Sequence, residues 1–384
     1  MHQMISVAPY SDEIMEKAKD LQLTLTLPPE LDSPFFIARM LRANGDEECV
    51  RRQISDIILH RRLVGYSKMD EDAILFKMFP IVYERFSISR FTGAPKSGNV
   101  HVFVQKMSGI LTVLPLSNIL HAYFALQEIF GQTIAAAERE SGKPSAIVTI
   151  LDLTGLNLSE FINPLSVNCK LARLIVTVWA EYFSETLVRI LIVNSPGIIS
   201  LMWQITKHIV DARTANRLVF LTDPAQLKDY LEPQAIPEEY GGLWRDDSGF
   251  ANPPEGCSTM PLPVTADEAT DVKNFWASHG ITAAPAPTHI SLKSRKSSDI
   301  TCMADGDGHI VYQFTTSGDV LFSILSVVNG KEQVVWPSIR LASLTVPEHG
   351  ALPCTQGEYI LRFTSPGHTW LATKVHVSTL FVGK

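Results

Sequence analysis

Residues 181–221 decide the fold and read EYFSETLVRILIVNSPGIISLMWQITKHIVDARTANRLVFL. Residues 189–193 are a short, branched, apolar run that Asn194-Ser195-Pro196 ends, which is typical of a strand buried on both faces. Residues 217–221 are a second run of the same kind. A helix pattern separates the two runs, so the stretch predicts strand, helix, strand.

The helix is predicted over residues 198–210 and is unusually apolar. Its apolar residues recur at spacings of three and four, namely Ile198, Leu201, Met202, Ile205 and Ile209. Ile199 and Trp203 widen this apolar arc on the opposite flank. Such a helix buries most of its circumference, either in a protein core or against a hydrophobic ligand that is not protein.

Three motifs, in this order along the chain, resemble the CRAL-TRIO lipid-binding domain. They are IVTILDLTGL at residues 147–156, Asn194-Ser195-Pro196 before the apolar helix, and IPEEYGG at residues 236–242. The resemblance implies an α/β domain whose central strand carries the Asp-Leu-x-Gly turn. It also implies that residues 198–210 form a mobile gate helix over a hydrophobic pocket.

The order of patterns predicts a multidomain protein that begins with a small all-α region. Its helices are expected at 12–19, 34–44 and 46–62, and the last turns Arg51, Arg52, Arg61 and Arg62 toward water. A solvated helix face explains this basic cluster more simply than a membrane contact does.

Strands that alternate with helices then predict an α/β domain with a mainly parallel sheet, and a C-terminal all-β sandwich follows it. The expected boundaries are 1–75 for the helical region, 76–250 for the CRAL-TRIO-like domain, 251–285 for a linker with one helix at 266–279, and 286–384 for the sandwich.

The sandwich is predicted because residues beyond 290 alternate between apolar and polar positions. Its strands are expected at 309–314, 320–327, 341–346, 358–363 and 374–382. Asp305-Gly306-Asp307-Gly308 is expected to form a hairpin turn rather than a calcium loop. GEYILRF at 357–363 resembles the GOLD (Golgi dynamics) domain, which implies contacts with trafficking proteins at the Golgi. The two domains together resemble the tocopherol-associated protein and supernatant protein factor group.

The resemblance also implies where a lipid head group binds. Family members that bind phosphatidylinositol carry a Glu before the Asn-x-Pro strand and Thr-x-x-Lys after the gate helix, and here Glu185, Thr214 and Arg217 stand at these positions. Arg217 keeps the cation and adds a planar fork that can hold a phosphate. In the alternative reading, Glu185 caps a helix turn and Arg217 pairs with it at the surface. Thr149 stands on the central strand, where relatives hold the phosphate of phosphatidylcholine.

The other residues expected to line the pocket are apolar, as a lipid tail requires. They are Ile147, Leu151 and Ile192 on the strands, with Ile198, Leu201, Met202, Trp203 and Ile205 on the gate helix.

Composition narrows the class of protein. The 384-residue chain is 46% apolar and carries a formal net charge of -7, which argues against general nucleic-acid binding. The sequence has neither an uninterrupted apolar run of about 18 residues nor the pattern of a secretory signal. A cytoplasmic protein with at most peripheral membrane association is therefore expected. Five widely spaced cysteines predict neither a zinc site nor a disulfide framework.

No nucleophile elbow, metalloprotease, phosphate-loop or dinucleotide-binding motif is present, so the chain is expected not to be an enzyme and to use no metal or cofactor. The predicted function is that of a soluble lipid-binding or lipid-transfer protein that shelters one lipid of the phosphatidylinositol, tocopherol or isoprenoid class. The alternative is a membrane-trafficking adaptor or lipid sensor that acts through protein contacts of the GOLD-like domain. Expected partners are a single lipid, a transient membrane surface and, through residues 286–384, a Golgi or trafficking protein.

Overall fold

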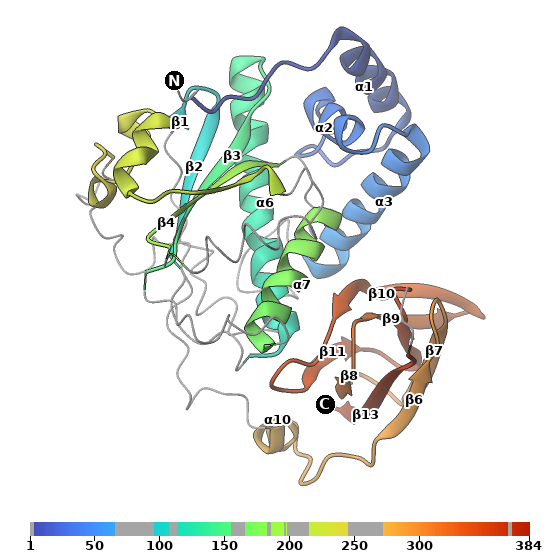
Figure 1. The fold of residues 1–384 in the computed structure, drawn as a ribbon. Coiled ribbons are helices and arrows are strands. Elements are labelled where there is room, and N and C mark those ends of the chain that lie inside the picture. The colour runs from blue at the N-terminus through green and yellow to red at the C-terminus, as the bar shows by residue number, and fades with distance from the viewer. Residues whose placement is uncertain are drawn as a thin grey trace.

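The structure is a computed structural model of the chain, drawn as a ribbon in Figure 1. N-terminal helices, a central α/β region and a C-terminal all-β region follow one another, which confirms the predicted fold class. The structure describes residues 4–65, 96–106, 114–154, 166–182, 186–195, 197, 215–244, 272–367 and 371–384.

The described helices of the N-terminal region are α1 (Asp12–Thr24), α2 (Pro34–Asn44) and α3 (Glu47–Val64). Each follows a polar N-cap, because Ser11, Ser33 and Asp46 accept hydrogen bonds from backbone N–H groups of the first turn. Gly45 and Gly65 end α2 and α3 in the left-handed conformation. The predicted helix starts are confirmed, and α1 extends beyond its predicted end at residue 19.

One predicted side-chain position in this region is wrong. Arg61 of α3 is buried rather than turned toward water, because its guanidinium pairs with Glu128 on a helix of the α/β region. Arg52 and Arg62 are exposed, as expected. The basic cluster is therefore split between solvent and a contact between two parts of the molecule.

The described strands of the α/β region form a five-stranded sheet in the order β1-β2-β3-β4-β5. Four strands are parallel and β1 is antiparallel to β2, which confirms the mainly parallel sheet. The bounds are β1 (Lys96–Ser97), β2 (Val100–Lys106), β3 (Ala146–Asp152), β4 (Leu187–Val193) and β5 (Leu218–Phe220).

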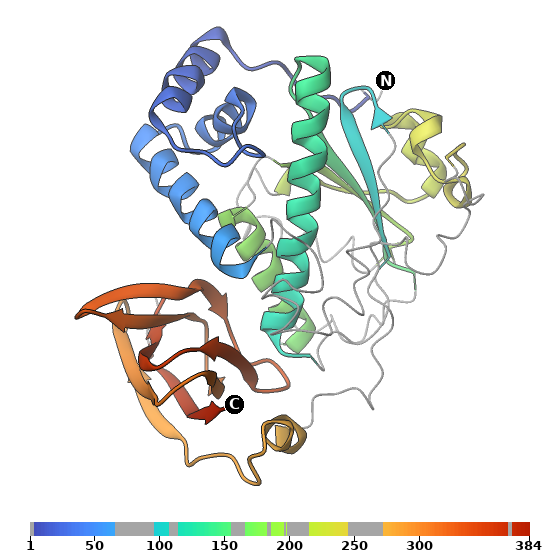
Figure 2. The same cartoon turned by 180° about the vertical axis from the view of Figure 1, so that it is seen from behind.

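Two helices lie on one face of this sheet. They are α6 (Leu116–Ser141), between β2 and β3, and α7 (Val167–Tyr182), between β3 and β4. Right-handed crossovers between neighbouring parallel strands place both helices on the same side. Figures 1 and 2 show α6 running along this side, where Phe130 and Ile134 pack against Phe103 and Ile147. We call this side the α6 face.

Short 3-10 segments cover the opposite face of the sheet. They are η4 (Pro224–Asp229), η5 (Pro233–Ala235) and η6 (Glu238–Tyr240). Leu227, Ile236 and Tyr240 pack there against Val148 and Leu191. The IPEEYGG motif at residues 236–242 therefore closes the face that lies away from α6.

The described strands of the C-terminal region form two antiparallel four-stranded sheets, β10-β9-β12-β7 and β11-β8-β13-β6. Phe314, Phe322 and Phe363 meet between the sheets with ring centroids 4.9 to 5.1 Å apart. Aromatic contacts of this kind fix how two sheets stack. The bounds are β6 (Thr288–Leu292), β7 (Ser297–Ala304), β8 (Gly308–Thr316), β9 (Val320–Val328), β10 (Lys331–Leu341), β11 (Glu348–Cys354), β12 (Gly357–Thr364) and β13 (Thr373–Gly383).

Two predictions for the sandwich are wrong. Residues 341–346 are not a separate strand, because Leu341 ends β10 and the following residues lead to β11. The turn at Asp305-Gly306-Asp307-Gly308 is not a hairpin, since it joins β7 in one sheet to β8 in the other. The strands β6, β7, β10 and β11 were not predicted. Pro337 and Pro353 interrupt the patterns of β10 and β11, and proline weakens a strand prediction.

The linker helix α10 (Val272–Ser278) is anchored on the sandwich. Trp276 is 1% exposed and donates a hydrogen bond from its indole N–H to the side chain of Gln313 in β8. The ring of Phe275 lies 4.3 Å from that of His349 in β11. This helix falls inside the expected range 266–279, whose first residues lie outside the described part of the chain.

None of the helices within the described ranges is long and apolar enough to cross a bilayer.

Gly242 offers a test of how tightly the closing motif packs. A Cβ atom at Gly242 would lie 1.9 Å from the carbonyl oxygen of Ile236, so Gly242→Ala should destabilise the protein by about 2 to 3 kcal/mol. A Cβ at Gly131 within α6 meets nothing within 4 Å, so Gly131→Ala should instead stabilise the protein by about 0.5 to 1 kcal/mol. Urea denaturation of both variants measures the difference. Equal stability of the two variants would contradict this packing.

Candidate functional site

The three motifs singled out in the sequence meet at the carboxylate of Asp152, the last residue of β3. Its Oδ1 accepts hydrogen bonds from the backbone N–H of Thr154 (2.8 Å), the Thr154 hydroxyl (2.7 Å) and the Asn194 side-chain amide (3.0 Å). Its Oδ2 accepts one from the hydroxyl of Tyr240 (2.7 Å). One side chain thus joins the Asp-Leu-x-Gly turn, the Asn-Ser-Pro end of β4 and the closing motif.

Parallel pairing explains why these residues meet. Asp152 and Val193 are paired in register at the carboxyl ends of β3 and β4, so Asn194 follows directly beside Asp152. Asn194 has a φ of 52°, and asparagine adopts this left-handed conformation more readily than most other residues do. The chain therefore leaves the sheet at a fixed point, with its turn held by Asp152.

Hydrogen bonding keeps Asp152 ionised. Burial raises the pKa of this carboxyl group, but the hydrogen bonds from Thr154, Tyr240 and Asn194 outweigh burial and leave the pKa below its ordinary value. An ionised carboxylate can accept from all these donors at once, whereas a neutral carboxamide offers them a single acceptor oxygen.

The predicted pocket residues that the structure describes lie together on the α6 face. One face of β3 carries Ile147, Thr149 and Leu151, and the residues between them point to the other face. Ile147 contacts α6. Ile192 shares a face of β4 with Ile190, which packs against the same cluster. At the Ile147 end this face is filled by Phe130 and Ile134, so protein side chains cover that end completely.

Arg217 is a predicted head-group residue that lies within the described part of the chain, whereas several other predicted site residues lie outside it. Arg217 is described: it is half-buried, and its carbonyl oxygen accepts a hydrogen bond from the N–H of Ile190 (2.7 Å) at the start of β5. Arg217 therefore lies beside β4. The predicted residues beyond the described ranges are Glu185, Thr214, Ile198, Leu201, Met202, Trp203 and Ile205.

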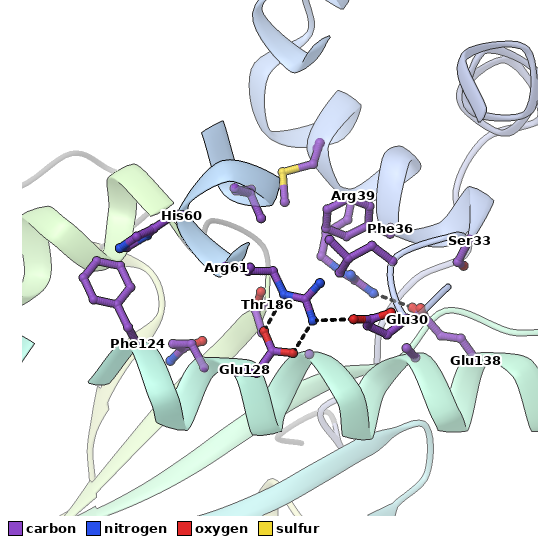
Figure 3. Close-up of a pocket in the computed structure, with 16 residues that line it drawn as sticks. Glu30, Ser33, Phe36, Arg39, His60, Arg61, Phe124, Glu128, Glu138 and Thr186 are labelled. Carbon is purple, nitrogen blue, oxygen red and sulfur yellow. Dashed lines mark hydrogen bonds and ion pairs between the residues drawn. The ribbon is translucent and has the colours of Figure 1, made fainter. Parts of the chain in front are cut away.

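A cavity of about 90 Å³ lies between the N-terminal helices and α6 (Figure 3). Pockets that hold drug-sized ligands have volumes of about 300 to 1,000 Å³, so this cavity is too small for a lipid tail. It has room for several water molecules, each of which needs about 10 to 15 Å³. Thr186, the residue after Glu185, also lines it.

Two ion pairs line this cavity and join the N-terminal helices to α6 (Figure 3). Arg39 of α2 pairs with Glu138 at 2.6 Å, and both side chains are almost fully buried. Arg61 of α3 donates from Nε to Glu128 at 2.8 Å and from Nη2 to Glu30 at 3.3 Å. Breaking such a buried pair leaves an uncompensated charge, so the contact demands one relative position of the helices.

Two buried polar atoms at this cavity lack hydrogen-bond partners among the described residues. They are Nε of Arg39 and Oε1 of Gln127. Buried groups of this kind are normally satisfied by protein or by ordered water. The cavity is therefore suited to ordered water or to a small polar group.

Burial also sets the ionisation around the cavity. Burial raises the pKa of Glu138, although Arg39 and the N–H of Ser145 partly oppose that rise. Burial lowers the pKa of His60 to about 4, so this imidazole is neutral at pH 7. The cavity lining therefore holds two cations beside three carboxylates, which makes it unsuited to a free anion.

Asp152 and the residues of both ion pairs were not predicted as site residues. The Asp-Leu-x-Gly turn was visible, but nothing local in the sequence indicates that Tyr240 reaches it. The partners Arg39 and Glu138 lie far apart in the chain and on different helices, so no sequence spacing links them. Within the described part of the chain, no group of His, Cys, Asp and Glu residues could hold a metal ion.

Comparison with known proteins adds a family match. Residues 101–242 match the model of the CRAL/TRIO domain, which confirms the CRAL-TRIO domain expected in this part of the chain. The CRAL-TRIO domain-containing protein C34C12.6 of Caenorhabditis elegans is 23% identical over 85% of this chain and 84% of its own length.

Two further similarities are shorter or more distant. The phosphatidylinositol transfer protein SFH5 of Kluyveromyces lactis is 33% identical over 19% of this chain and 24% of its own length. The crystal structure of Sfh5 covers 71% of this chain and 99% of its own, with 14% identity and a TM-score of 0.42.

The bond between Tyr240 and Asp152 can be measured by a double-mutant cycle. Tyr240→Phe removes one donor to a charged acceptor and should cost about 1.5 to 3 kcal/mol of unfolding free energy. In an Asp152→Asn background the same change should cost clearly less, giving a coupling of about 1 kcal/mol or more. Urea denaturation of the four proteins gives the coupling, and strict additivity would rule the interaction out.

The pair between Arg61 and Glu128 should contribute far more than an exposed pair on the same helix. Arg61→Ala leaves Glu128 buried and unpaired, so a loss of about 3 to 5 kcal/mol is expected. Arg51→Ala removes an exposed pair with Glu47 one turn away and should cost about 0.5 kcal/mol or less. Denaturation at pH 7 compares the two, and similar losses would show that Arg61 is not buried as described.

Proposed function

We propose that this protein binds and transfers a single lipid, which it shelters between the α6 face of its sheet and a gate helix at residues 198–210. The observation that carries this proposal is the Asp152 network, in which the three family motifs share one carboxylate. The match of residues 101–242 to the CRAL/TRIO domain supports the same reading.

The network supports a gate because it anchors the chain immediately before the proposed gate helix. Asn194 is held by Asp152, and Asp152 is held in turn by Thr154 and Tyr240. Movement of the chain that follows Asn194 would therefore leave β4 in place. Hinges of this kind absorb the backbone change at a few residues next to a rigid element.

The free energy of exposing a lipid tail explains why shelter is needed. Each methylene group taken out of water contributes about 0.8 kcal/mol, so a tail of about sixteen carbons exposed to water costs on the order of 12 kcal/mol. A dry pocket removes most of this barrier to transfer. The apolar side chains of Leu151 and Ile192, beyond the end of the α6 face where α6 covers Ile147, are suited to forming its floor.

We propose phosphatidylinositol as the lipid, with Glu185, Thr214 and Arg217 at the head group. The position of Arg217 beside β4 supports this assignment, and so does the name of the relative described above as a phosphatidylinositol transfer protein. Thr149 is the residue proposed to contact a phosphatidylcholine phosphate. Tocopherol or an isoprenoid is the competing ligand class, because it needs only the apolar floor.

The C-terminal sandwich is proposed to be a GOLD-like domain that contacts Golgi or trafficking proteins from a cytoplasmic location, without catalytic activity. The motif at 357–363 supports this through β12, where Tyr359, Leu361 and Phe363 point into the core. Arg362 points outward and pairs with Asp299 (2.7 Å) and Glu332 (2.8 Å). This exposed charged face is the surface proposed to meet a protein partner if the chain acts as an adaptor or sensor.

Uptake of labelled lipids tests the proposed function and ligand together. Purified protein is offered phosphatidylinositol, phosphatidylcholine, tocopherol and squalene in vesicles, and bound lipid is read by native mass spectrometry. Arg217→Ala should reduce phosphatidylinositol uptake at least tenfold and leave the apolar ligands unchanged, because a charge-assisted phosphate contact is lost.

The matched control is Arg62→Ala, which removes an exposed cation from α3 and should alter no uptake. Equal loss of all four lipids in Arg217→Ala would contradict the head-group assignment. A wild-type protein that carries no lipid and takes up none of the four would contradict the lipid-binding proposal itself.

A further inference from the structure

The C-terminal sandwich shares one hydrophobic core with the helices of the rest of the molecule. Leu116, Ile119 and Leu120 of α6 belong to the same buried cluster as Trp336 and Ile339 of β10. Leu171 and Leu174 of α7 also belong to it, and Figures 1 and 2 show the sandwich against the ends of these helices. A buried apolar contact of this kind favours a fixed arrangement over a flexible tether.

One carboxylate from the sandwich reaches the N-terminus of α6. Glu348 is the first residue of β11 and is 1% exposed. Its Oε1 accepts a hydrogen bond from the N–H of Leu116 at 2.7 Å, and its Oε2 accepts one from the N–H of Ser117 at 3.1 Å. Both amides belong to the first turn of α6, whose N–H groups have no partners within the helix.

The helix has no cap of its own at this end. Pro115 occupies the N-cap position, and no side chain from the flanking residues makes a cap hydrogen bond. The described part of the chain also provides Glu348 with no cationic partner, so the helix N-terminus is its main electrostatic complement. The cap of α6 therefore comes from a different region of the fold.

The carboxylate of Glu348 lies among buried aromatic and titratable groups. Burial, and after it the neighbouring Glu348 carboxylate, raises the pKa of the Tyr312 phenol in β8. His121 of α6 lies one turn further along, with its ring 5.2 Å from that of Trp336, and burial lowers its pKa. Burial raises the pKa of Glu348 to about 7, although the bonds from Ser117 and Leu116 oppose that rise.

We infer that Glu348 is a positioning residue that holds the first turn of α6 in place, and that the sandwich is a structural part of the lipid-binding unit rather than a separable tether. The same helix lines the cavity beside the N-terminal region through Gln127, Glu128 and Glu138. Displacement of the sandwich would remove the cap from α6 and expose Leu116 and Trp336 to water. The inference does not depend on which lipid, if any, the protein binds.

Hydrogen exchange of the full-length protein tests this role directly. The amides of Leu116 and Ser117 should exchange at least tenfold faster in Glu348→Ala than in the wild type, because both lose their hydrogen-bond acceptor. Glu348→Gln should give an intermediate rate, since its one amide oxygen can still accept. Glu332→Gln, an exposed carboxylate on the sandwich away from α6, is the matched control and should change neither amide.

A pH profile measures how far burial disfavours the charged form of Glu348 in the folded protein. A carboxyl group with a raised pKa in the folded state contributes its stability fully below about pH 4.5 and loses it as the pH rises through about 7. Between pH 4.5 and pH 7.5, the equilibrium constant for unfolding of the wild type should therefore rise on the order of a hundredfold relative to that of Glu348→Gln. Unchanged exchange at Leu116 and Ser117 in both variants would overturn the inference. If Glu348→Ala does not fold, the Gln variant decides it alone.

Discussion

The hydrogen bonds to Asp152 are the constraint on which the α/β region depends. Parallel strands end side by side, so the polar groups of the turns that leave them crowd together and must find partners. One ionised side chain satisfies donors from Thr154, Asn194 and Tyr240. The end of β3, the end of β4 and the closing motif are thereby held in one arrangement.

The helix α6 is the second organising element, because each neighbouring part of the molecule places a charge on it. Glu138 and Glu128 pair with arginines from α2 and α3, and its N-terminus receives Glu348 from β11. Buried ion pairs add little net stability, but they penalise every arrangement that separates them. These charges therefore specify how the N-terminal helices, the sheet and the sandwich sit around α6.

The features that the sequence predicted well are those with local causes. The predicted starts of the three N-terminal helices are of this kind, because Ser11, Ser33 and Asp46 cap α1, α2 and α3 from the adjacent residue. The features it missed depend on distant partners. Arg61 has the sequence context of a solvated cation and is buried only because Glu128 faces it. Glu348 reads as an ordinary surface carboxylate, since nothing near it in the sequence indicates the helix that it caps.

The cap that Glu348 provides has a consequence for synthesis. Leu116 and Glu348 are 232 residues apart in the chain, so the ribosome completes the sheet and its helices long before it makes the residue that finishes α6. Until then the start of α6 has unbonded amides and an uncovered apolar end, as partly made domains often do. The nascent protein therefore passes through a stage in which most of its sequence exists but the central helix is incomplete. Chaperones would meet the chain at that stage.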